Sequence, residues 1–246
     1  MTFADHFSAL AARYATYRPR YPDALVAALV ARCAAHELAW DAGCGTGQLS
    51  VALAAHFTRV VATEPAAAQL ADAEAHPRVE YRQEAAEASS LADASADLAV
   101  AAQAAHWFDW SRYVAEVARV ARRGALVALV SYGDFVVGGA AGEVVAPYVA
   151  AVAPCWPPGR EHVTNGYRDL VWPWPAVDVP PIAMTAAWTR DELVGYIATW
   201  SATARERAAH GAGRLEALGH ALAAAVPDPA ARIAIEWPLA IKLARR

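Results

Sequence analysis

Short apolar runs alternate with segments of helical periodicity along the first half of the chain. The continuous runs "ADLAVAAQ" and "GALVALVSYG" are typical of strands that are buried on both faces of a sheet. Apolar residues recur at helical spacing in residues 22–35, 47–55, 66–75 and 110–121. Because strands and helices alternate, the pattern predicts a parallel sheet that helices cover on both faces.

The pattern changes after Gly133. Residues 154–181 hold several tryptophans and too many prolines for the interior of a helix or a strand. Further along, Thr189 and Glu192 have the spacing of a capping box, which predicts a helix over residues 189–209.

The end of the chain is predicted to form one more helix and one strand. Residues 214–225 keep helical periodicity, and residues 231–246 are apolar enough for a final strand. Pro238 lies inside that strand and has no N–H group, so it indicates a sheet edge or a bulge.

Composition narrows the class of protein. With 246 residues, 57% of them hydrophobic, the chain can bury the core of one α/β domain with an appended lobe. The net charge of −4 and the lack of a Lys/Arg run argue against a nucleic-acid partner. Cys33, Cys44 and Cys155 lie far apart, which predicts reduced thiols and no zinc site. No apolar run has membrane-spanning length, so we expect a cytoplasmic protein without a membrane partner.

The stretch "AWDAGCGTGQ" carries the strongest chemical signal. An apolar strand leads into Gly43, Gly45 and Gly47, and a predicted helix follows directly. Glycines at this point allow unusual backbone angles and let a ligand lie against the main chain at a helix N-terminus. A tight turn without a ligand needs only one glycine, so the pattern favours a ligand site.

Two classes of nucleotide ligand fit such a loop. The dinucleotide fingerprint G-x-G-x-x-G requires a third glycine at position 48, where this chain has Gln48. Asp41 would repel a pyrophosphate and favours a ligand that carries an ammonium group. Glu64, at the end of the next predicted strand, suits ribose hydroxyls in either class and does not discriminate between them.

The chain resembles class I S-adenosylmethionine-dependent methyltransferases. "DAGCGTG" and "VVATEP" are similar to their motifs I and II, and the segment from "ADASADLAV" to "ALVSYG" is similar to the rest of their catalytic core. Within that family, "YATYRPRYP", "HWFD", "PPGREHVTNGYRDL" and "TWSATARERAA" resemble the branch of trans-aconitate methyltransferase. The resemblance implies a Rossmann-like α/β fold with a seven-stranded, mostly parallel sheet and a C-terminal lobe that covers the substrate.

The resemblance also implies where the cofactor S-adenosylmethionine, and its product S-adenosylhomocysteine, would lie. The three glycines would pass under the methionyl and ribose parts, with Asp41 near the amino group and Glu64 on the ribose hydroxyls. Pro65 would lie against the adenine. Relatives often place an acid after the third strand, where this chain has Ala85, so Ala86 and Glu87 would supply the adenine contacts.

The N-terminal "YATYRPRYP" allows two interpretations. The tyrosines can pack an arm against the core while Arg18 stays solvated. The resemblance instead implies an arm that closes over the cofactor, with Tyr14 and Arg18 near its carboxylate. A guanidinium suits that role because it can bind both carboxylate oxygens at once.

The segment from Gln103 to Trp107 follows the fourth predicted strand. Ligands of open α/β sheets lie beyond the carboxyl ends of the strands, which places Gln103 beside the cofactor and Trp107 in the acceptor pocket. Asp109 is the single candidate partner at ligand spacing from His106, and one candidate alone does not support a metal site, so no metal is expected. His106 can be a structural histidine, a polar wall of the pocket, or the general base that a nitrogen or phenol acceptor needs. A carboxylate acceptor needs no base. Asp109 is expected to cap the next helix.

The tryptophan-rich lobe is expected to select the acceptor. Arg160 and Tyr167 could bind an acidic molecule, and Trp200 could line an apolar one, although packing explains each residue alone. The tryptophans together favour an enclosed, partly aromatic pocket for a small molecule. The sequence does not identify the methyl acceptor, and a carboxylate is one acceptor class that fits the resemblance.

We therefore expect a methyltransferase that is a monomer or a weak homodimer. Two alternatives stay open: a nicotinamide-dependent oxidoreductase, and a cofactor-binding scaffold without turnover. The expected organisation is an arm and helix over 1–36, a cofactor-binding core over 37–145, a substrate lobe over 146–230, and a final core strand over 231–246.

The first prediction separates cofactor residues from acceptor residues. Glu64→Ala should weaken binding of S-adenosylmethionine because it removes the ribose contact, whereas His106→Ala should leave the affinity nearly intact. Isothermal titration calorimetry measures both. Loss of cofactor binding in His106→Ala would refute its placement on the acceptor side.

Overall fold

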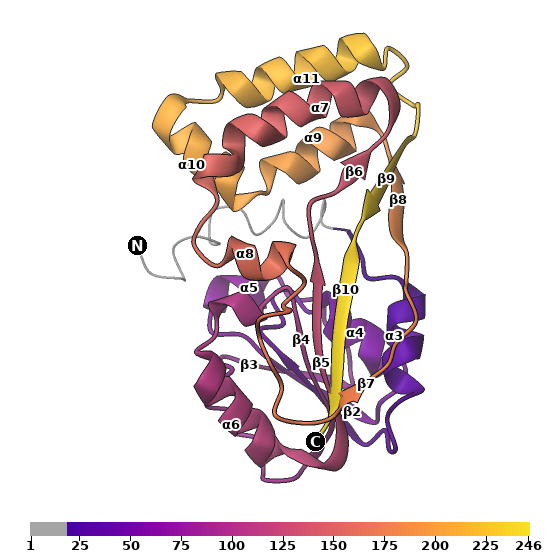
Figure 1. Ribbon diagram of the computed structural model, residues 1–246, viewed down its shortest axis with the longest axis vertical. Helices are drawn as coiled ribbons and strands as arrows, with labels where there is room; N and C mark the ends of the chain where they lie inside the picture. The colour runs from indigo at the N-terminus through magenta and orange to yellow at the C-terminus, as the bar shows by residue number, and fades with distance from the viewer. Residues whose placement is uncertain (1–18) are drawn as a thin grey trace.

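The computed structural model describes residues 19–246, and its centre is one seven-stranded sheet (Figure 1). The first five strands in spatial order run parallel, and β10 runs antiparallel to its neighbours β5 and β7. This confirms the predicted seven-stranded, mostly parallel sheet. In spatial order the strands are β3 (Val79–Arg82), β2 (Arg59–Thr63), β1 (Leu38–Ala42), β4 (Ala96–Ala102), β5 (Ala121–Tyr132), β10 (Leu239–Arg245) and β7 (Ala176–Val177).

Helices cover both faces of the sheet. On one face, α3 (Asp23–Val30) and α4 (Gln48–Ala54) bury Leu29 and Leu53 against Leu98 of β4. On the other face, α6 (Trp110–Val120) packs Tyr113 against Trp40 of β1 (Figure 1). The short helix α5 (Ala67–Ala71) connects β2 to β3. Successive residues of β5 alternate between these two clusters, as expected for a strand that is buried on both faces.

A smaller lobe is built on a second sheet of three antiparallel strands (Figure 1). These strands are β6 (Val136–Val137), β9 (Ile233–Trp237) and β8 (Met184–Trp188). Their apolar side chains pack with helices of the lobe, which are α7 (Gly139–Val152), α9 (Arg190–Ala198), α10 (Ser201–His210) and α11 (Gly213–Ala225). The short helix η2 (Ala153–Cys155) also belongs to the lobe, whereas α8 (Arg160–Thr164) packs Val163 into the cluster on the large sheet. Sequence patterns did not predict the second sheet.

The helix predicted over residues 189–209 is two helices. Thr189 and Glu192 form the predicted capping box of α9, which ends at Ala198. Trp200 then adopts an extended conformation, with φ −70° and ψ 139°, before α10 begins at Ser201. Because Trp200 is 3% exposed, the break places its side chain inside the protein.

The final strand predicted over residues 231–246 is also divided. Residues up to Trp237 pair with β8 in the small sheet, and residues from Leu239 onward pair with β5 in the large sheet. Pro238 lies between the two paired segments, where the chain leaves one sheet and enters the other. Because neither ladder uses a hydrogen bond from residue 238, its missing N–H group removes none. The proline therefore marks a crossing between the two sheets.

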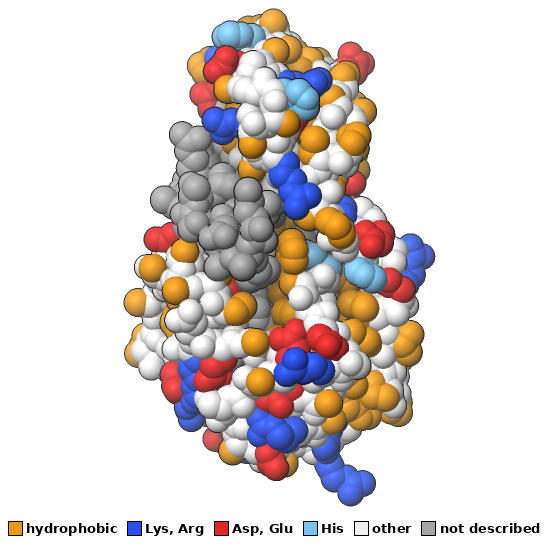
Figure 2. All heavy atoms as spheres, turned by 90° about the vertical axis from the view of Figure 1, so that its left-hand side faces the viewer, with side chains coloured by type: hydrophobic (Ala, Val, Ile, Leu, Met, Phe, Trp, Pro, Cys, Tyr) orange, Lys and Arg blue, Asp and Glu red, His pale blue; other side chains and the backbone are white. Residues whose placement is uncertain are grey.

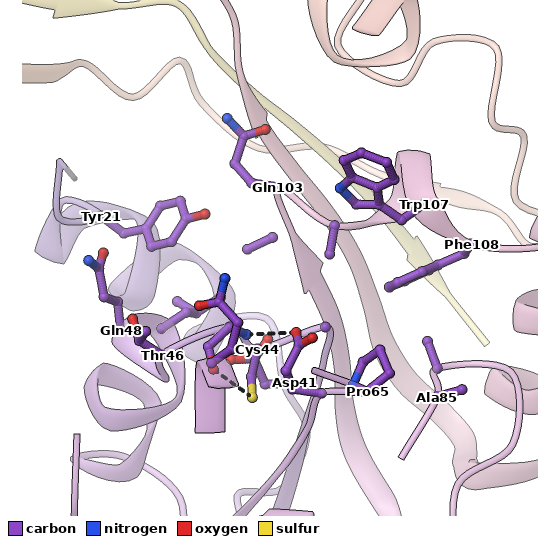
Figure 3. A pocket seen from close by; sticks show the side chains of 18 of the residues that line it. Tyr21, Asp41, Cys44, Thr46, Gln48, Pro65, Ala85, Gln103, Trp107 and Phe108 are labelled. Carbon is purple, nitrogen blue, oxygen red and sulfur yellow. Dashed lines mark hydrogen bonds between the residues drawn. The ribbon is translucent and has the colours of Figure 1, made fainter. Parts of the chain in front are cut away.

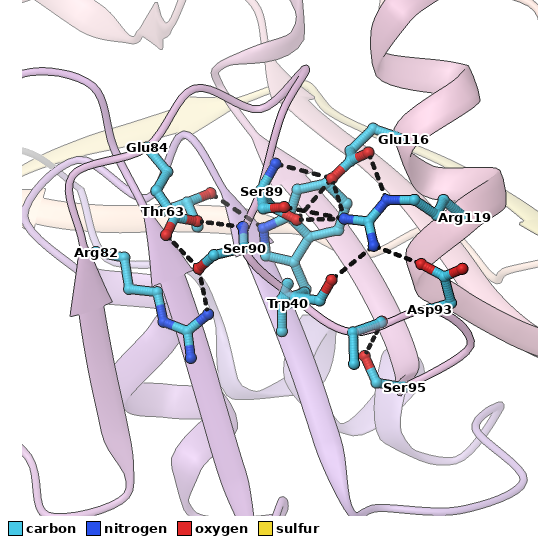
Figure 4. Close-up of polar contacts among 12 residues, drawn as sticks. Trp40, Thr63, Arg82, Glu84, Ser89, Ser90, Asp93, Ser95, Glu116 and Arg119 are labelled. Carbon is cyan, nitrogen blue, oxygen red and sulfur yellow. Dashed lines mark hydrogen bonds and ion pairs between the residues drawn. The ribbon is translucent and has the colours of Figure 1, made fainter.

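A cluster of polar contacts joins α6 to the loop before β4 (Figure 4). One carboxylate oxygen of Glu116 accepts hydrogen bonds from the N–H and the hydroxyl of Ser89, both at 2.8 Å. Arg119 donates to Glu116 at 2.6 Å and to Asp93 at 2.7 Å. Burial acts to raise the pKa of Glu116, but the hydrogen bonds from Arg119 and Ser89 outweigh it and hold this pKa below its usual value.

The surface is chemically mixed. On the face that Figure 2 shows, Lys/Arg and Asp/Glu side chains are interspersed over the described residues. Within residues 19–246, no helix is long and apolar enough to cross a membrane.

The Glu116 cluster leads to a stability prediction. Glu116→Gln should lower the free energy of unfolding by about 1.5–3 kcal/mol because it removes a largely buried charge that two partners stabilise. Urea denaturation measures this change. Glu143→Gln, at an exposed position of α7, is the matched control and should stay within about 0.5 kcal/mol of the wild type. Equal effects of the two substitutions would contradict the prediction.

Candidate active site

The order of strands places a crevice at the carboxyl ends of β1 and β4. These two strands are neighbours, but the chain continues from β1 to β2 on one side and from β4 to β5 on the other. Such a reversal of direction separates the loops that follow the two strands, and ligands bind in the gap. The glycine loop follows β1, and the short 3₁₀ helix η1 (Ala105–Trp107) follows β4.

The three glycines of the loop have different physical roles. All have positive φ, with values of 70° for Gly43, 57° for Gly45 and 84° for Gly47. A Cβ on Gly43 would lie 2.6 Å from the Cβ of Ala104, and a Cβ on Gly47 would collide with the Tyr81 ring. At Gly45 the nearest atom would be 3.8 Å away. Gly43 and Gly47 therefore permit close packing, whereas Gly45 leaves an open backbone beside the cavity.

A cavity of about 400 Å³ lies over this loop (Figure 3). Its volume is in the range of small-molecule sites. In Figure 3, Asp41, Cys44 and Pro65 lie on one side, and Gln103 and Trp107 lie on the opposite side. The residues around it are Pro19, Tyr21, Asp41, Gly43, Cys44, Gly45, Thr46, Gln48, Leu49, Glu64, Pro65, Gln69, Ala85, Ala86, Glu87, Ala102, Gln103, Ala104, Trp107, Phe108, Tyr132 and Arg205.

Two buried carboxylates lie at the base of the cavity. Asp41 accepts a hydrogen bond from the Ser50 hydroxyl at 2.6 Å, and burial raises its pKa to about 6. Glu64 accepts backbone N–H bonds from Gly45 at 3.1 Å and Ala66 at 3.0 Å, and burial raises its pKa as well. Because desolvation destabilises both negative charges, a cation or a hydrogen-bond donor placed here would be stabilised.

Two amide oxygens at the cavity have no hydrogen-bond partner among the described residues. They are the buried Oε1 atoms of Gln69 and Gln103. Gln103 also has φ +54°, an uncommon value for a residue other than glycine, while its Nε2 donates to the Tyr132 carbonyl at 3.0 Å. Unpaired buried acceptors and a strained backbone are concentrated at functional sites.

Most of the predicted cofactor residues meet at this cavity. Of the predicted set, Asp41, Gly43, Gly45, Glu64, Pro65, Ala86, Glu87 and Gln103 line it, and Gly47 supports the loop without lining it. Tyr14 and Arg18 lie outside the described residues. Sequence patterns did not point to Gln69, Tyr132 or Arg205. Of these, Tyr132 carried a local signal, because it ends an apolar strand at the same sheet edge.

A second cavity of about 100 Å³ adjoins the first on the side of the lobe. Gln103, Trp107 and Tyr132 line both cavities, so the two spaces share a wall. The remaining residues of the second cavity are His106, Gly133, Asp134, Phe135, Trp156, Pro157, Arg160, Val163, Tyr196, Trp200 and Ser201. Six of its 14 lining residues are tryptophan, tyrosine or phenylalanine, so the cavity is partly aromatic.

His106 lies on η1, and its ring contacts Tyr167 and Trp107. Its Nδ1 is 2.9 Å from the Tyr167 hydroxyl, and its ring packs against Trp107 with centroids 4.9 Å apart. Burial, together with the positive charges of Arg160 and His162, lowers the pKa of His106 to about 4. The ring is therefore uncharged at neutral pH.

The other predicted acceptor residues have distinct placements. Arg160 lines the second cavity, pairs with Asp134 and stacks its guanidinium on Trp156 at 4.2 Å. Trp200 lines the same cavity. Tyr167 is 1% exposed and belongs to neither lining, so it reaches the site through His106 alone. Asp109 caps α6 as predicted, accepting from the Arg112 N–H at 3.2 Å.

Comparisons with known proteins agree with this geometry. A family model described as a methyltransferase domain matches residues 40–129, which hold the glycine loop and β4. A protein of Dictyostelium discoideum that is named as a methyltransferase is 31% identical over 204 residues. That alignment covers 81% of this chain and 78% of the relative.

Solved structures show the same relationship. A protein from Anaeromyxobacter dehalogenans, named as a type II methyltransferase, is 44% identical with a TM-score of 0.86 and covers 93% of this chain and 98% of that chain. The YcgJ protein of Bacillus subtilis shares the fold, with a TM-score of 0.54, 16% identity and coverage of 91% and 97% of the two chains. This chain belongs to the class I S-adenosylmethionine-dependent methyltransferase family.

Proposed function

We propose that this enzyme transfers a methyl group to a small molecule that binds in the second cavity. The observation that carries the proposal is the shared wall between the two cavities, formed by Gln103, Trp107 and Tyr132. One cavity has the glycine loop and buried acids of a nucleoside site, and the other has an aromatic lining under the lobe. A donor in the first and an acceptor in the second would face each other across this wall.

The first cavity fits S-adenosylmethionine in size and in chemistry. Asp41 offers a buried carboxylate to an ammonium group, and Glu64 offers one to a pair of ribose hydroxyls. Pro65 supplies an apolar surface for the adenine, with Ala86 and Glu87 at its edge. The open backbone at Gly45 leaves room for the part of the cofactor between its amino group and its ribose.

Charge in the first cavity also fits the cofactor. Its described lining contains Asp41, Glu64 and Glu87 as acids and Arg205, from α10 of the lobe, as a base. The acids suit a sulfonium and an ammonium group, while Arg205 suits a carboxylate. A pyrophosphate would face the three acids, which disfavours the nicotinamide alternative.

The protein's contribution to the chemistry is position and exclusion of water. When bound, S-adenosylmethionine supplies a methyl group on a sulfonium, and the electron pair of the broken S–C bond stays on sulfur. Trp107 and Tyr132 would hold the acceptor in line with that methyl group. Holding two reactants in attack geometry can supply about 7–11 kcal/mol of barrier reduction.

The second cavity limits the acceptor. At about 100 Å³ it is smaller than the 300–1,000 Å³ that is common for drug-sized ligands. It therefore holds a small group, such as one ring or a short carboxylic acid. Trp156 and Trp200 favour an apolar or planar body, and Arg160 favours an acid. These features support a carboxylate acceptor, in keeping with the branch that the lobe sequence resembles.

Calorimetry tests the cofactor assignment. S-Adenosylhomocysteine should bind in the micromolar range or tighter, and NAD should show no heat of binding. The opposite pattern would favour the oxidoreductase. A screen of small carboxylic acids with methyl-labelled cofactor should then show transfer. Binding of S-adenosylhomocysteine without transfer to any small molecule would favour the non-catalytic scaffold.

Asp41 predicts a pH dependence of cofactor affinity. Only its charged form pairs with the ammonium group, and its pKa in the free protein is about 6. Affinity for S-adenosylhomocysteine should therefore rise by up to about tenfold from pH 5 to pH 7. Calorimetry at several pH values measures the slope, and Asp41→Asn should flatten most of it. An unchanged slope in that variant would contradict the role of Asp41.

The same substitution has a signature in stability. A carboxyl group whose pKa is raised on folding lowers the free energy of unfolding as the pH rises from about 4 to about 6. Asp41→Asn removes this loss and can keep the bond from Ser50. Without ligand, the variant should therefore unfold at higher urea concentration than the wild type at pH 7, although it binds the cofactor more weakly. A less stable variant would show that the hydrogen bond from Ser50 stabilises the Asp41 carboxylate by more than burial destabilises it.

A further inference from the structure

The pair of Tyr167 and His106 fixes a proton at the wall of the second cavity. The two residues are 61 positions apart, and the hydroxyl lies 2.9 Å from Nδ1 of the imidazole. Burial raises the pKa of Tyr167 well above its usual value, so the hydroxyl keeps its proton. Either group could therefore donate to the other, and the surroundings decide which one does.

The surroundings assign Tyr167 as the donor. The Tyr167 hydroxyl keeps its proton, and the residue is 1% exposed, so this proton needs an acceptor inside the protein. Among the described residues, the acceptor within reach is Nδ1 of His106. Nδ1 is then the unprotonated nitrogen of the ring.

A neutral imidazole that accepts at Nδ1 carries its hydrogen at Nε2. Burial and the charges of Arg160 and His162 keep the His106 ring neutral. Its Nε2 has no hydrogen-bond partner within residues 19–246, and His106 lines the second cavity. The ring therefore presents an N–H group to whatever binds there.

The Tyr167 backbone is held in an unusual conformation that secures this contact. Its φ is +57°, which is rare for an aromatic residue. Its N–H donates to the His162 carbonyl at 2.7 Å, and its own carbonyl accepts from Lys242 of β10 at 3.2 Å. Such strain persists only where surrounding contacts determine the conformation. The large sheet thus fixes the orientation of the hydroxyl.

Arg160 adds a positive charge to the same cavity. Its terminal nitrogen pairs with Asp134, and its guanidinium lies over the Trp156 ring, which also lines the cavity. A guanidinium attracts an anionic oxygen and can donate hydrogen bonds to it. His106 and Arg160 therefore both favour a ligand oxygen that is rich in electrons.

We infer that Tyr167 is a positioning residue that holds His106 as a neutral Nε2–H donor, which binds an anionic oxygen of the acceptor. The inference rests on the proposed function and deepens it, because it names the side chain that would bind the proposed carboxylate acceptor and the residue that orients that side chain. His106 then orients the acceptor and removes no proton. A carboxylate is already ionised at neutral pH, so methylation of its oxygen requires no base.

Nitrogen-15 NMR of histidine-labelled protein tests the proton position without any substrate. At pH 7, His106 should show an unprotonated Nδ1 and a protonated Nε2, with exposed His56 as the internal reference. His106→Gln assigns the signals. Tyr167→Phe should lose this selection and give a mixture of tautomers. A protonated Nδ1, or a charged ring at pH 7, would overturn the inference.

Benzoate is the probe for the ligand class, in the presence of S-adenosylhomocysteine. It should perturb the Nε2 signal and bind on the order of tenfold more weakly to His106→Ala than to the wild type. His106→Gln restores an N–H group and should recover part of the affinity. Equal binding to wild type and His106→Ala, or no binding to the wild type, would overturn the substrate class.

The two proposals fail in different ways. If S-adenosylhomocysteine does not bind at all, the proposed function is wrong, whereas the tautomer of His106 is measured without it. With an identified carboxylate substrate, a base at His106 predicts equal loss of kcat in His106→Ala and His106→Gln. A donor predicts that His106→Gln retains more activity than His106→Ala.

Discussion

Close packing of Gly43 against Ala104 is the constraint on which the site depends. A Cβ at residue 43 would lie 2.6 Å from the Ala104 side chain and 3.1 Å from the Phe108 ring. With no side chain there, the loop after β1 can lie directly against the segment after β4. This contact places the glycine loop beside the segment of Gln103 and Trp107, and these two residues line both cavities.

Electrostatics in the two cavities are opposite in character. The first cavity holds negative charge that burial makes costly, as the raised pKa values of Asp41 and Glu64 show. The second holds a neutral histidine next to the positive charge of Arg160. Burial of a charge without a full partner lowers stability, and such groups are concentrated where a ligand will supply the partner. The arrangement suits a cationic donor on one side and an anionic acceptor on the other.

The lobe and the core are joined by more than their two crossing strands. Tyr167 and Trp172, between α8 and β7, belong to the hydrophobic cluster on one face of the large sheet. Lys242 of β10 donates to carbonyls of this segment, including that of Tyr167. These contacts link the segment that holds the His106 ring to the large sheet, and a fixed position of such groups is what catalysis by positioning requires.

The sequence by itself determined the features whose physical cause is local. The alternation of apolar runs and helices specified the parallel sheet, and the glycine loop with Asp41 and Glu64 pointed to the base of the first cavity. The capping roles of Thr189 and Asp109 were also predicted from the sequence, because each cap bonds to a backbone N–H group only three residues further along the chain.

Only the tertiary structure decided the features that depend on distant partners. The helix break at Trp200 follows from burial of an aromatic side chain, which outweighs the local propensity to continue the helix. The sequence predicted that Pro238 interrupts the final strand. It did not predict the second sheet before Pro238, because that sheet depends on pairing with the distant strand β8. The role of His106 was undecidable from its neighbours in sequence, because the hydroxyl that sets its proton comes from 61 residues away. Its chemistry is set by burial and by Tyr167, and neither can be inferred from the order of residues.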